Sequence, residues 1–287
     1  MRAQFIETTT KLLHDDARLA LVLADISTTM FRDAGAPKGR VFNVGIREQL
    51  MIGVAAGLAL TGFRPIVHTI ATFAVERPFE QLKLDLGHQD VGAVVVTNGA
   101  SYDYAVSGRT HQAPEDVALV SSLPGWDVHV PGHPEEVATI LRRVAKEEGR
   151  AYVRLSTEQN EASHPEGVVR RGSRGTVIAV GPMLERVLAA TSGLDLTVLY
   201  VTTVRPLDAM LVRSTLASPN VVLVEPYQQG TSSAQAAAAL EDVPHRLLAI
   251  GVRNVEYRAY GTPEDHERAH GLDPTSLRRR IAEFLSS

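Results

Sequence analysis

Apolar runs of strand length alternate with helical patterns along nearly the whole chain. Such alternation is typical of parallel sheets whose faces are covered by helices. The predicted strands of a first sheet cover residues 21–24, 66–70, 93–97, 127–130 and 152–155, and those of a second sheet cover 176–180, 196–201, 221–224 and 247–250. The predicted helices cover residues 46–61, 76–86, 114–122 and 134–147, an alanine-rich segment at 232–240, and a closing amphipathic segment at 274–284. We therefore expect an α/β protein with two doubly wound sheets, parallel or mixed.

A polar interval separates the two sets of strands. Residues 157–175 show no apolar period and contain Pro and Gly, which are typical of a loop. We place a linker at 161–175, between a first domain at 1–160 and a second domain at 176–287. The chain of 287 residues is long enough for each domain to bury a core of its own.

The composition narrows the class of protein. A hydrophobic fraction of 44% and a net charge of -4 are typical of a globular protein without a polyanionic partner, so we expect no contact with nucleic acid. The absence of cysteine excludes disulfides, thiolate catalysis and zinc–thiolate sites. We see neither a signal peptide nor an apolar run of membrane-spanning length, and we expect a cytoplasmic protein without membrane contact.

The helix predicted at 46–61 contains a single acidic residue, Glu48, close to its start. Apolar residues after Glu48 cover nearly every face of this helix, which predicts burial in a core or in an interface. Burial favours the protonated form of a carboxyl unless a partner intervenes, and such a carboxyl can exchange a proton with a ligand nitrogen. The alternative is an acidic residue that the helix dipole stabilises in the first turn. The pattern marks Glu48 as a candidate acid–base group.

Three segments resemble motifs of the transketolase family. The sequence GIREQ at 45–49 is similar to the family's Gly-Ile-Arg-Glu-His/Gln motif, the segment 65–86 resembles the one whose aromatic residues stack on a pyrimidine, and 107–125 resembles the Gly-x-x-His-Gln loop with its acidic helix. They occur in the family's order and spacing, and the similarity continues through 151–157 and covers nearly the whole chain. The resemblance implies the pyrimidine-binding and C-terminal domains of a transketolase, which in some organisms form a separate subunit.

The resemblance implies a site for the aminopyrimidine end of thiamine diphosphate. Glu48 would hydrogen-bond the ring nitrogen, and Phe73 and Phe79 would stack on the ring, which contributes on the order of 1 kcal/mol beyond area burial. His111 would relay protons beside the substrate. Asp25 follows the first strand, where ligand-site residues of parallel sheets gather. The alternatives are core packing for the two phenylalanines and a helix cap for Asp25.

Two arginines are candidate contacts for an anionic sugar, because a guanidinium fork suits a phosphate. Arg154 resembles the family's substrate-phosphate arginine, whereas Arg77 resembles an arginine of the deoxyxylulose phosphate synthase branch or is a surface residue. Transketolases usually place an acidic residue four positions before the loop histidine, and this chain has Ser107 before His111. Asp103 is a replacement if the loop is shifted. The expected reaction is transfer of a two-carbon ketol unit between a ketose and an aldose, phosphorylated or otherwise anionic, with an altered choice of donor or acceptor.

A partner chain is implied by a motif that this sequence lacks. The family holds the diphosphate and Mg²⁺ with Gly-Asp-Gly and a later Asn, and no Gly-Asp-Gly occurs here. The resemblance therefore implies an N-terminal subunit that holds the diphosphate and Mg²⁺, no metal ligand in this chain, and self-association into an α2β2 assembly with the active site at the interface. Alternatives are a deoxyxylulose phosphate synthase-like subunit, the beta subunit of a 2-oxoacid dehydrogenase, and a non-catalytic scaffold. The presence of Glu48, Phe73 and His111 together argues for the enzyme.

Overall fold

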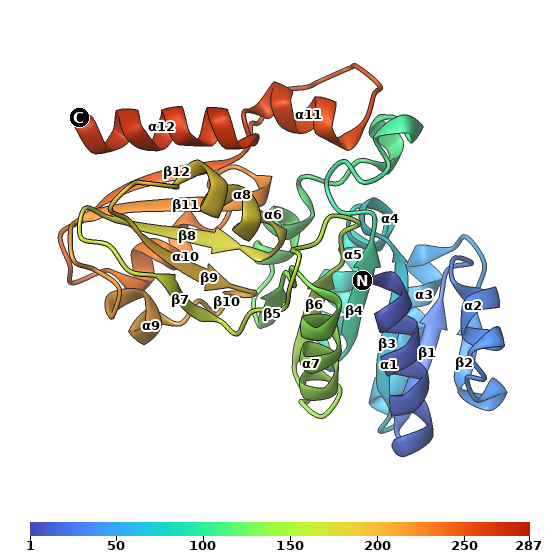
Figure 1. The fold of residues 1–287 in the computed structure, drawn as a ribbon. Helices are drawn as coiled ribbons and strands as arrows, with labels where there is room; N and C mark the ends of the chain where they lie inside the picture. The colour runs from blue at the N-terminus through green and yellow to red at the C-terminus, as the bar shows by residue number, and fades with distance from the viewer.

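Two twisted sheets form the centre of the structure, a computed structural model that describes residues 1–287 (Figure 1). The strands of the first sheet are β1 (Leu19–Leu23), β2 (Val41–Asn43), β3 (Arg64–Ile70), β4 (Val94–Asn98), β5 (Trp126–His129), β6 (Arg150–Arg154) and β10 (Thr203–Arg205). The strands of the second sheet are β7 (Gly167–Arg170), β8 (Thr176–Val180), β9 (Thr197–Val201), β11 (Asn220–Gln228) and β12 (Arg246–Val252). The α/β class with two mixed sheets is confirmed, and all the predicted strands are present with small shifts at their ends.

The strand orders show how the chain winds. The first sheet has the order β10-β5-β6-β4-β3-β1-β2, and every neighbouring pair is parallel except β10 with β5. The second sheet has the order β12-β11-β8-β9-β7, and only β7 is antiparallel to its neighbour. Parallel neighbours require crossover connections, which the helices supply. Helices therefore cover both faces of the first sheet.

The helices and turns of the first domain connect its strands in chain order. They are α1 (Arg2–Asp15), α2 (Thr28–Asp33), η1 (Lys38–Arg40), α3 (Glu48–Leu60), α4 (Ala71–Val75), α5 (Phe79–Gln81), η2 (Leu82–His88), η3 (Ala105–Ser107), η4 (Arg109–His111), α6 (Asp116–Ser121) and α7 (Pro134–Val144). Those of the second domain are η5 (Gly181–Met183), α8 (Leu184–Ala190), α9 (Ala209–Arg213), α10 (Ser233–Ala239), α11 (Pro263–His270) and α12 (Pro274–Ser286). No helix is both long enough and apolar enough to span a bilayer.

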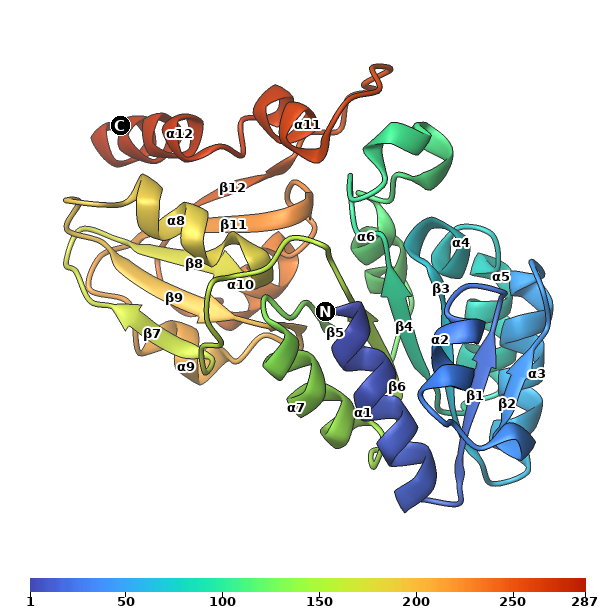
Figure 2. The ribbon, with the colours of Figure 1, turned by 45° about the vertical axis from the view of Figure 1, so that its right-hand side comes forward.

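The two faces of the first sheet are covered by different helices. α1 and α7 lie side by side on one face, as Figures 1 and 2 show. Ile66 of β3 belongs to the apolar cluster that includes α1 and α7, whereas its neighbour Val67 belongs to the cluster that includes α3 and α6. Successive strand residues point to opposite faces of a sheet, so a strand covered on both faces is apolar throughout.

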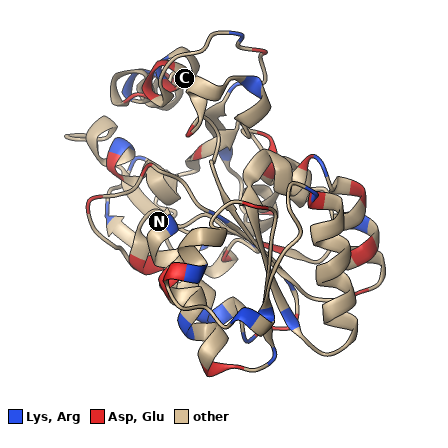
Figure 3. Cartoon of the chain, turned by 90° about the vertical axis from the view of Figure 1, so that its right-hand side faces the viewer, with Lys and Arg blue, Asp and Glu red and all other residues tan.

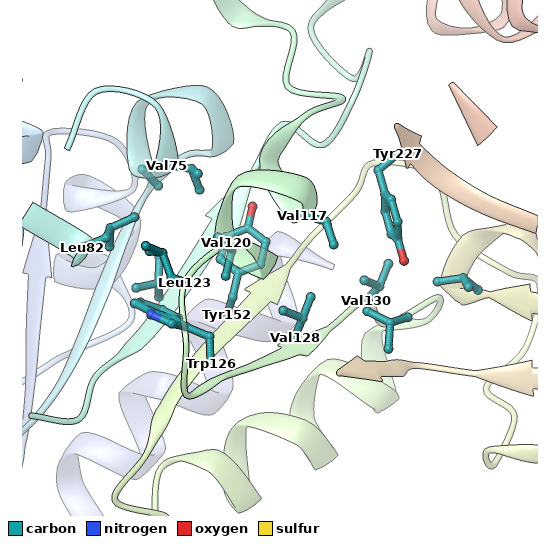
Figure 4. Packing of buried hydrophobic residues seen from close by; sticks show 14 of the residues in the cluster. Val75, Leu82, Val117, Val120, Leu123, Trp126, Val128, Val130, Tyr152 and Tyr227 are labelled. Carbon is teal, nitrogen blue, oxygen red and sulfur yellow. The ribbon is translucent and has the colours of Figure 1, made fainter. Parts of the chain in front are cut away.

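The core of the first domain continues into the second. Trp126 of β5 and Tyr152 of β6 lie in the same apolar cluster as Tyr227 of β11. Val117 and Val120 of α6 belong to it as well, and Val117 lies between Tyr152 and Tyr227 in Figure 4. The two domains are therefore joined by apolar packing as well as by the chain.

Two short strands differ from the sequence-based expectation. β7 lies inside the interval 161–175 that the sequence predicts as a linker, and it adds residues 167–170 to the edge of the second sheet. β10 follows β9 immediately, but it pairs with β5 and so belongs to the first sheet. Both strands are edge strands whose pairing depends on tertiary contacts, and neither has a long apolar run in the sequence.

The helix predicted at 46–61 is α3, and it is buried on one side only. Within α3, the side chains of Met51 and Ile52 are fully buried, whereas Leu50 is 47% exposed and Leu60 is 60% exposed. The apolar residues on all faces of α3 are therefore not all covered within this chain. Of the two environments that the pattern predicts, a core and an interface, the core accounts for one face of α3.

Candidate active site

Glu48 is the first residue of α3, and it is 1% exposed. The preceding residue, Arg47, provides no side-chain cap for the helix. The first N–H groups of a helix have no intrahelical partner and carry a partial positive charge, which stabilises a carboxylate at this position. α3 therefore holds an acidic group at the edge of the core, close to the surface of the domain.

The guanidinium of Arg77 lies between Glu48 and Phe73. Arg77 Nη1 donates a hydrogen bond to Glu48 Oε2 at 2.8 Å, and Arg77 Cζ lies 3.7 Å from the centroid of the Phe73 ring. Gln49 Nε2 donates to the backbone carbonyl of Arg77 at 3.2 Å, which ties the loop after α4 to the start of α3. The Arg77 side chain is 40% exposed, so the ion pair is open to solvent on one side.

His111 extends this group of side chains. Its ring centroid lies 5.1 Å from that of Phe73 at an interplanar angle of 72°, an edge-to-face contact. Thr110 Oγ1 lies 2.9 Å from His111 Nδ1. The turn that presents the histidine requires glycine at Gly108, which has a φ of +73° and a Cβ position blocked by Tyr260. We call Glu48, Phe73, Arg77 and His111 the Glu48 cluster.

Asp25 lies at the carboxyl end of β1 and is exposed, with a φ of +69°. Asn43 Oδ1, at the end of β2, accepts hydrogen bonds from the backbone N–H groups of Asp25 and Gly45, each at 3.0 Å. The N-cap of α2 is Ser27, so Asp25 is not the cap that we considered as an alternative. A non-glycine residue in the left-handed region is uncommon and often lies at a functional site. Asn43, which our sequence analysis did not single out, fixes the loop that leads to Glu48.

Arg154 lies apart from the Glu48 cluster, in a closed network. Its Nε donates to both carboxylate oxygens of Asp116 at 3.0 and 2.8 Å, and its Nη2 donates to Ser101 Oγ at 2.7 Å. Tyr152 Oη also donates to Asp116 Oδ2 at 2.6 Å. The side chains of Arg154 and Asp116 are 1% and 0% exposed. The carboxylate balances the charge of this arginine, and this geometry differs from the expected contact with a substrate phosphate.

Asp103 is also fully engaged within the chain. Its carboxylate accepts hydrogen bonds from Ser156 Oγ at 3.0 Å, from Thr157 Oγ1 at 2.8 Å, and from the backbone N–H groups of Thr157 and Ala100 at 2.9 Å. Burial raises the pKa of Asp103, and these hydrogen bonds oppose the rise. Asp103 therefore fastens its loop to the end of β6 and does not take the place of the missing acidic residue at Ser107.

None of the hydrogen bonds and ring contacts within the Glu48 cluster involves Phe79 or Ser107, two further predicted site residues. Phe79 is half-buried and packs against the main apolar cluster, which agrees with the core-packing alternative. Ser107 is exposed at the end of η3, and its carbonyl accepts a hydrogen bond from Thr110 Oγ1 at 3.5 Å. Sequence reasoning also missed the role of Asp116, although an acidic residue at the start of the helix after the His111 loop was a usable signal.

The geometry defines a class of protein. The Glu48 cluster and Asp25 belong to a two-domain α/β protein whose polar side chains gather beyond the carboxyl ends of parallel strands, where ligands bind in such sheets. Comparison with known proteins identifies the family. The profile of the transketolase pyrimidine-binding domain matches residues 1–161, and that of the transketolase C-terminal domain matches residues 167–277. The chain belongs to the transketolase family.

Individual relatives agree with this assignment. The chain is 50% identical to a protein of Rhodococcoides fascians described as an uncharacterized 33.6 kDa protein in the fasciation locus, over 99% of this chain and 95% of the relative. It is 28% identical to the 6-deoxy-6-sulfo-D-fructose transketolase subunit of Clostridium sp. (strain MSTE9), over 88% of this chain and 85% of the relative. A solved structure of a split gene transketolase, an inactive β4 tetramer, is similar with a TM-score of 0.85 and 26% identity over 99% of this chain and 97% of the other.

Proposed function

We propose that this chain is the pyrimidine-binding subunit of a two-subunit transketolase, which transfers a two-carbon ketol unit between a ketose and an aldose. The observation that carries the proposal is a buried carboxyl, Glu48, that the Arg77 guanidinium links to the Phe73 ring, which in turn contacts His111. Thiamine diphosphate supplies, when bound, the carbon centre that breaks and forms the carbon–carbon bond of such a transfer. A purely structural subunit requires none of the Glu48, Phe73 and His111 side chains.

The side chains of the Glu48 cluster fit an aminopyrimidine. A planar group of the chain itself, the Arg77 guanidinium, already stacks on Phe73 and directs an N–H group at Glu48. A pyrimidine ring with a protonated ring nitrogen offers the same flat face and the same hydrogen bond. The chemistry of the Glu48 cluster therefore suits the cofactor end that the family resemblance implies.

Three residues of the Glu48 cluster then have a task at the cofactor or the sugar. Glu48 holds a proton at the ring nitrogen of the pyrimidine, and its burial keeps water from competing for that hydrogen bond. Phe73 orients the ring by stacking. His111 lies on the loop side of Phe73 and moves protons at the oxygens of the sugar.

The exposed face of α3 supports a partner subunit. Ile46 is 69% exposed, Leu50 47% and Leu60 60%, and α3 carries no charged residue after Glu48. Charged residues are otherwise spread over both domains (Figure 3). An apolar helix face beside a site is typical of an interface between subunits. We infer that the partner is a diphosphate-binding chain that holds Mg²⁺, and that two such pairs associate. No group of three or more His, Asp and Glu side chains that would hold a metal ion is present in this chain.

We infer an anionic group on the sugar. The relative from Clostridium is named for a sulfonated ketose. Arg77 is the arginine of the Glu48 cluster that is open to solvent, whereas Arg154 is closed by Asp116. Ser107 lies four residues before His111, in the position where an acidic residue usually contacts a donor hydroxyl, so its hydroxyl contacts the sugar without adding a negative charge.

Titration calorimetry tests this function. The chain alone, titrated with thiamine diphosphate and Mg²⁺, is expected to show no micromolar binding. The complex with a chain that carries Gly-Asp-Gly and a later Asn is expected to bind the cofactor and to transfer a ketol unit from a sulfonated or phosphorylated ketose. Micromolar binding by the chain alone would contradict the split site, and a complex that binds no cofactor would contradict the function.

A further inference from the structure

The Arg77 guanidinium occupies the position between the Phe73 face and the Glu48 carboxylate. It makes two contacts there, a stack with its Cζ 3.7 Å from the ring centroid and an ion pair at 2.8 Å. In the proposed function, the aminopyrimidine makes the same two contacts: it stacks on Phe73 and hydrogen-bonds Glu48. One flat cationic group and one flat heterocycle cannot use the same ring face and the same carboxylate oxygen at once.

The geometry points to a displacement. We propose, on the basis of the proposed function, that Arg77 fills the pyrimidine position while the site is empty and has to leave it before thiamine diphosphate binds. Arg77 keeps Glu48 paired and the Phe73 face covered in the empty chain. A buried carboxylate left without a partner is costly, so a side chain that pairs with it stabilises the empty site.

The surroundings of Arg77 permit this exchange. Its side chain is 40% exposed, whereas that of Glu48 is 2% exposed. The guanidinium therefore enters water when it leaves, and the carboxylate stays in place for the ring nitrogen. The Gln49 side chain donates a hydrogen bond to the backbone carbonyl of Arg77 and so holds the loop in place. The Arg77 side chain can therefore move while the backbone of the loop stays fixed. After release, the guanidinium lies at the mouth of the site, where it can pair with an anionic group of the sugar.

The displacement lowers the apparent affinity for the cofactor. If Arg77 fills the site most of the time, the apparent dissociation constant of the ligand equals the intrinsic constant divided by the fraction of molecules whose site is open. Replacing Arg77 with Met removes the charge and the planar fork but keeps the length of the side chain. In the complex with the partner subunit, we expect Arg77→Met to bind thiamine diphosphate about tenfold more tightly than the wild type. Arg77→Lys keeps the charge without the planar fork and is expected to lie between the two.

The experiment measures the dissociation constant of thiamine diphosphate with Mg²⁺ by calorimetry in the reconstituted complex. Arg279→Met, which breaks an exposed ion pair with Glu283 on α12, is the matched control and is expected to leave the constant unchanged. Crystal structures of the complex with and without thiamine diphosphate give a second measurement, the distance from Arg77 Nη1 to Glu48 Oε2. We expect this distance to exceed hydrogen-bond range only in the cofactor-bound state.

The outcomes separate this proposal from the proposed function. Equal or weaker cofactor binding by Arg77→Met, in a complex whose wild type does bind, would overturn the displacement and leave the function standing. An Arg77–Glu48 contact that persists in the cofactor-bound structure would overturn it as well. A wild-type complex that binds no thiamine diphosphate would overturn both.

Discussion

Two of the arginine–carboxylate pairs in the first domain differ in how they are enclosed. The pair of Arg154 with Asp116 is buried on both sides and is joined by Tyr152 and Ser101. The pair of Arg77 with Glu48 is buried only at the carboxylate. A closed pair fixes strands and loops relative to one another, because neither charge can leave without the other becoming unpaired. A pair that is open on the cation side can exchange its cation for a ligand.

The difference in enclosure also distinguishes Arg77 from Arg154 as candidate contacts for a substrate anion. The sequence marks both Arg77 and Arg154 as candidates for a substrate anion. The structure joins Arg77 to the candidate site and places Arg154 in a network that holds β6, α6 and the loop after β4 together. Exposure of the guanidinium, rather than the residue type, distinguishes the two.

The largest expected effect comes from opening the closed pair. Asp116→Ala leaves the buried guanidinium of Arg154 without a counter-charge and removes the acceptor of Tyr152, so we expect a loss of about 3–5 kcal/mol in the free energy of unfolding. Urea unfolding followed by circular dichroism measures it. Glu283→Ala, which breaks the exposed pair with Arg279, is the control and is expected to cost less than about 1 kcal/mol. A loss as small for Asp116→Ala would contradict the structural role of this pair.

Glu48→Gln tests the open side of the comparison. In the complex with the partner subunit, we expect exchange of the thiazolium C2 proton of thiamine diphosphate to slow by about a hundredfold, or roughly 3 kcal/mol, because an amide cannot share a proton with the ring nitrogen. Deuterium exchange followed by NMR measures the rate. Glu80→Gln changes an exposed carboxyl on α5 and serves as the control. An unaltered rate in the Glu48→Gln complex would contradict the catalytic assignment and leave Glu48 as a helix residue.

His68 is a further polar side chain of the first domain, and it is fully buried. Its Nδ1 lies 2.9 Å from the carbonyl oxygen of Val96 and its Nε2 lies 2.9 Å from Ser27 Oγ, which fits a neutral ring that donates from Nδ1 and accepts at Nε2. Burial lowers the pKa of His68 to about 3 from its ordinary value of 6.5. The unfolded chain therefore binds a proton below pH 6.5 that the folded chain does not.

The stability that the neutral, buried His68 contributes is fully present above pH 6.5, the pKa of the unfolded state. It is lost as the pH falls toward about 3, the pKa of His68 in the folded state. Between pH 6.5 and pH 5, we expect the free energy of unfolding to decrease by about 2 kcal/mol through His68. Burial raises the pKa values of Glu158 and Glu225 to about 7, so their contributions change in the opposite direction. The difference between the wild type and His68→Gln, measured by urea unfolding at each pH, isolates the histidine. A difference that does not change with pH would show that His68 is not buried in its neutral form.

The smallest expected effect is on the stability of the open pair. Arg77→Met in the chain alone is expected to lower the free energy of unfolding by about 1–2 kcal/mol, because it leaves the buried Glu48 carboxylate without its partner but on a side that is open to solvent. Thermal unfolding measures it beside Asp116→Ala. A loss that approached that of Asp116→Ala would show that the two pairs are equally structural and would remove the distinction drawn here.

The sequence determined the fold class and named the candidate residues of the site. Runs of apolar residues without alternation predict strands covered on both faces, and β1, β4, β8 and β9 are buried throughout. Glu48, Phe73 and His111 stand in motifs that resemble those of the transketolase family in order and spacing, and this resemblance predicts a common site. This information is local, because it depends on residue types at fixed spacings within one segment.

Only the tertiary structure decided which charged groups are free to act. Arg154 and Asp116 are separated by 38 residues, and the sequence does not show that the two side chains pair with each other. The sequence also left open whether the apolar faces of α3 pack inside the chain or are left for a partner, and the structure leaves Leu50 and Leu60 exposed. A periodic apolar pattern predicts that one face of a helix is buried. Which other part of the protein covers that face depends on contacts between segments far apart in the chain. The same reason applies to Arg77, whose contact with Glu48 forms only when the loop after α4 and the start of α3 meet.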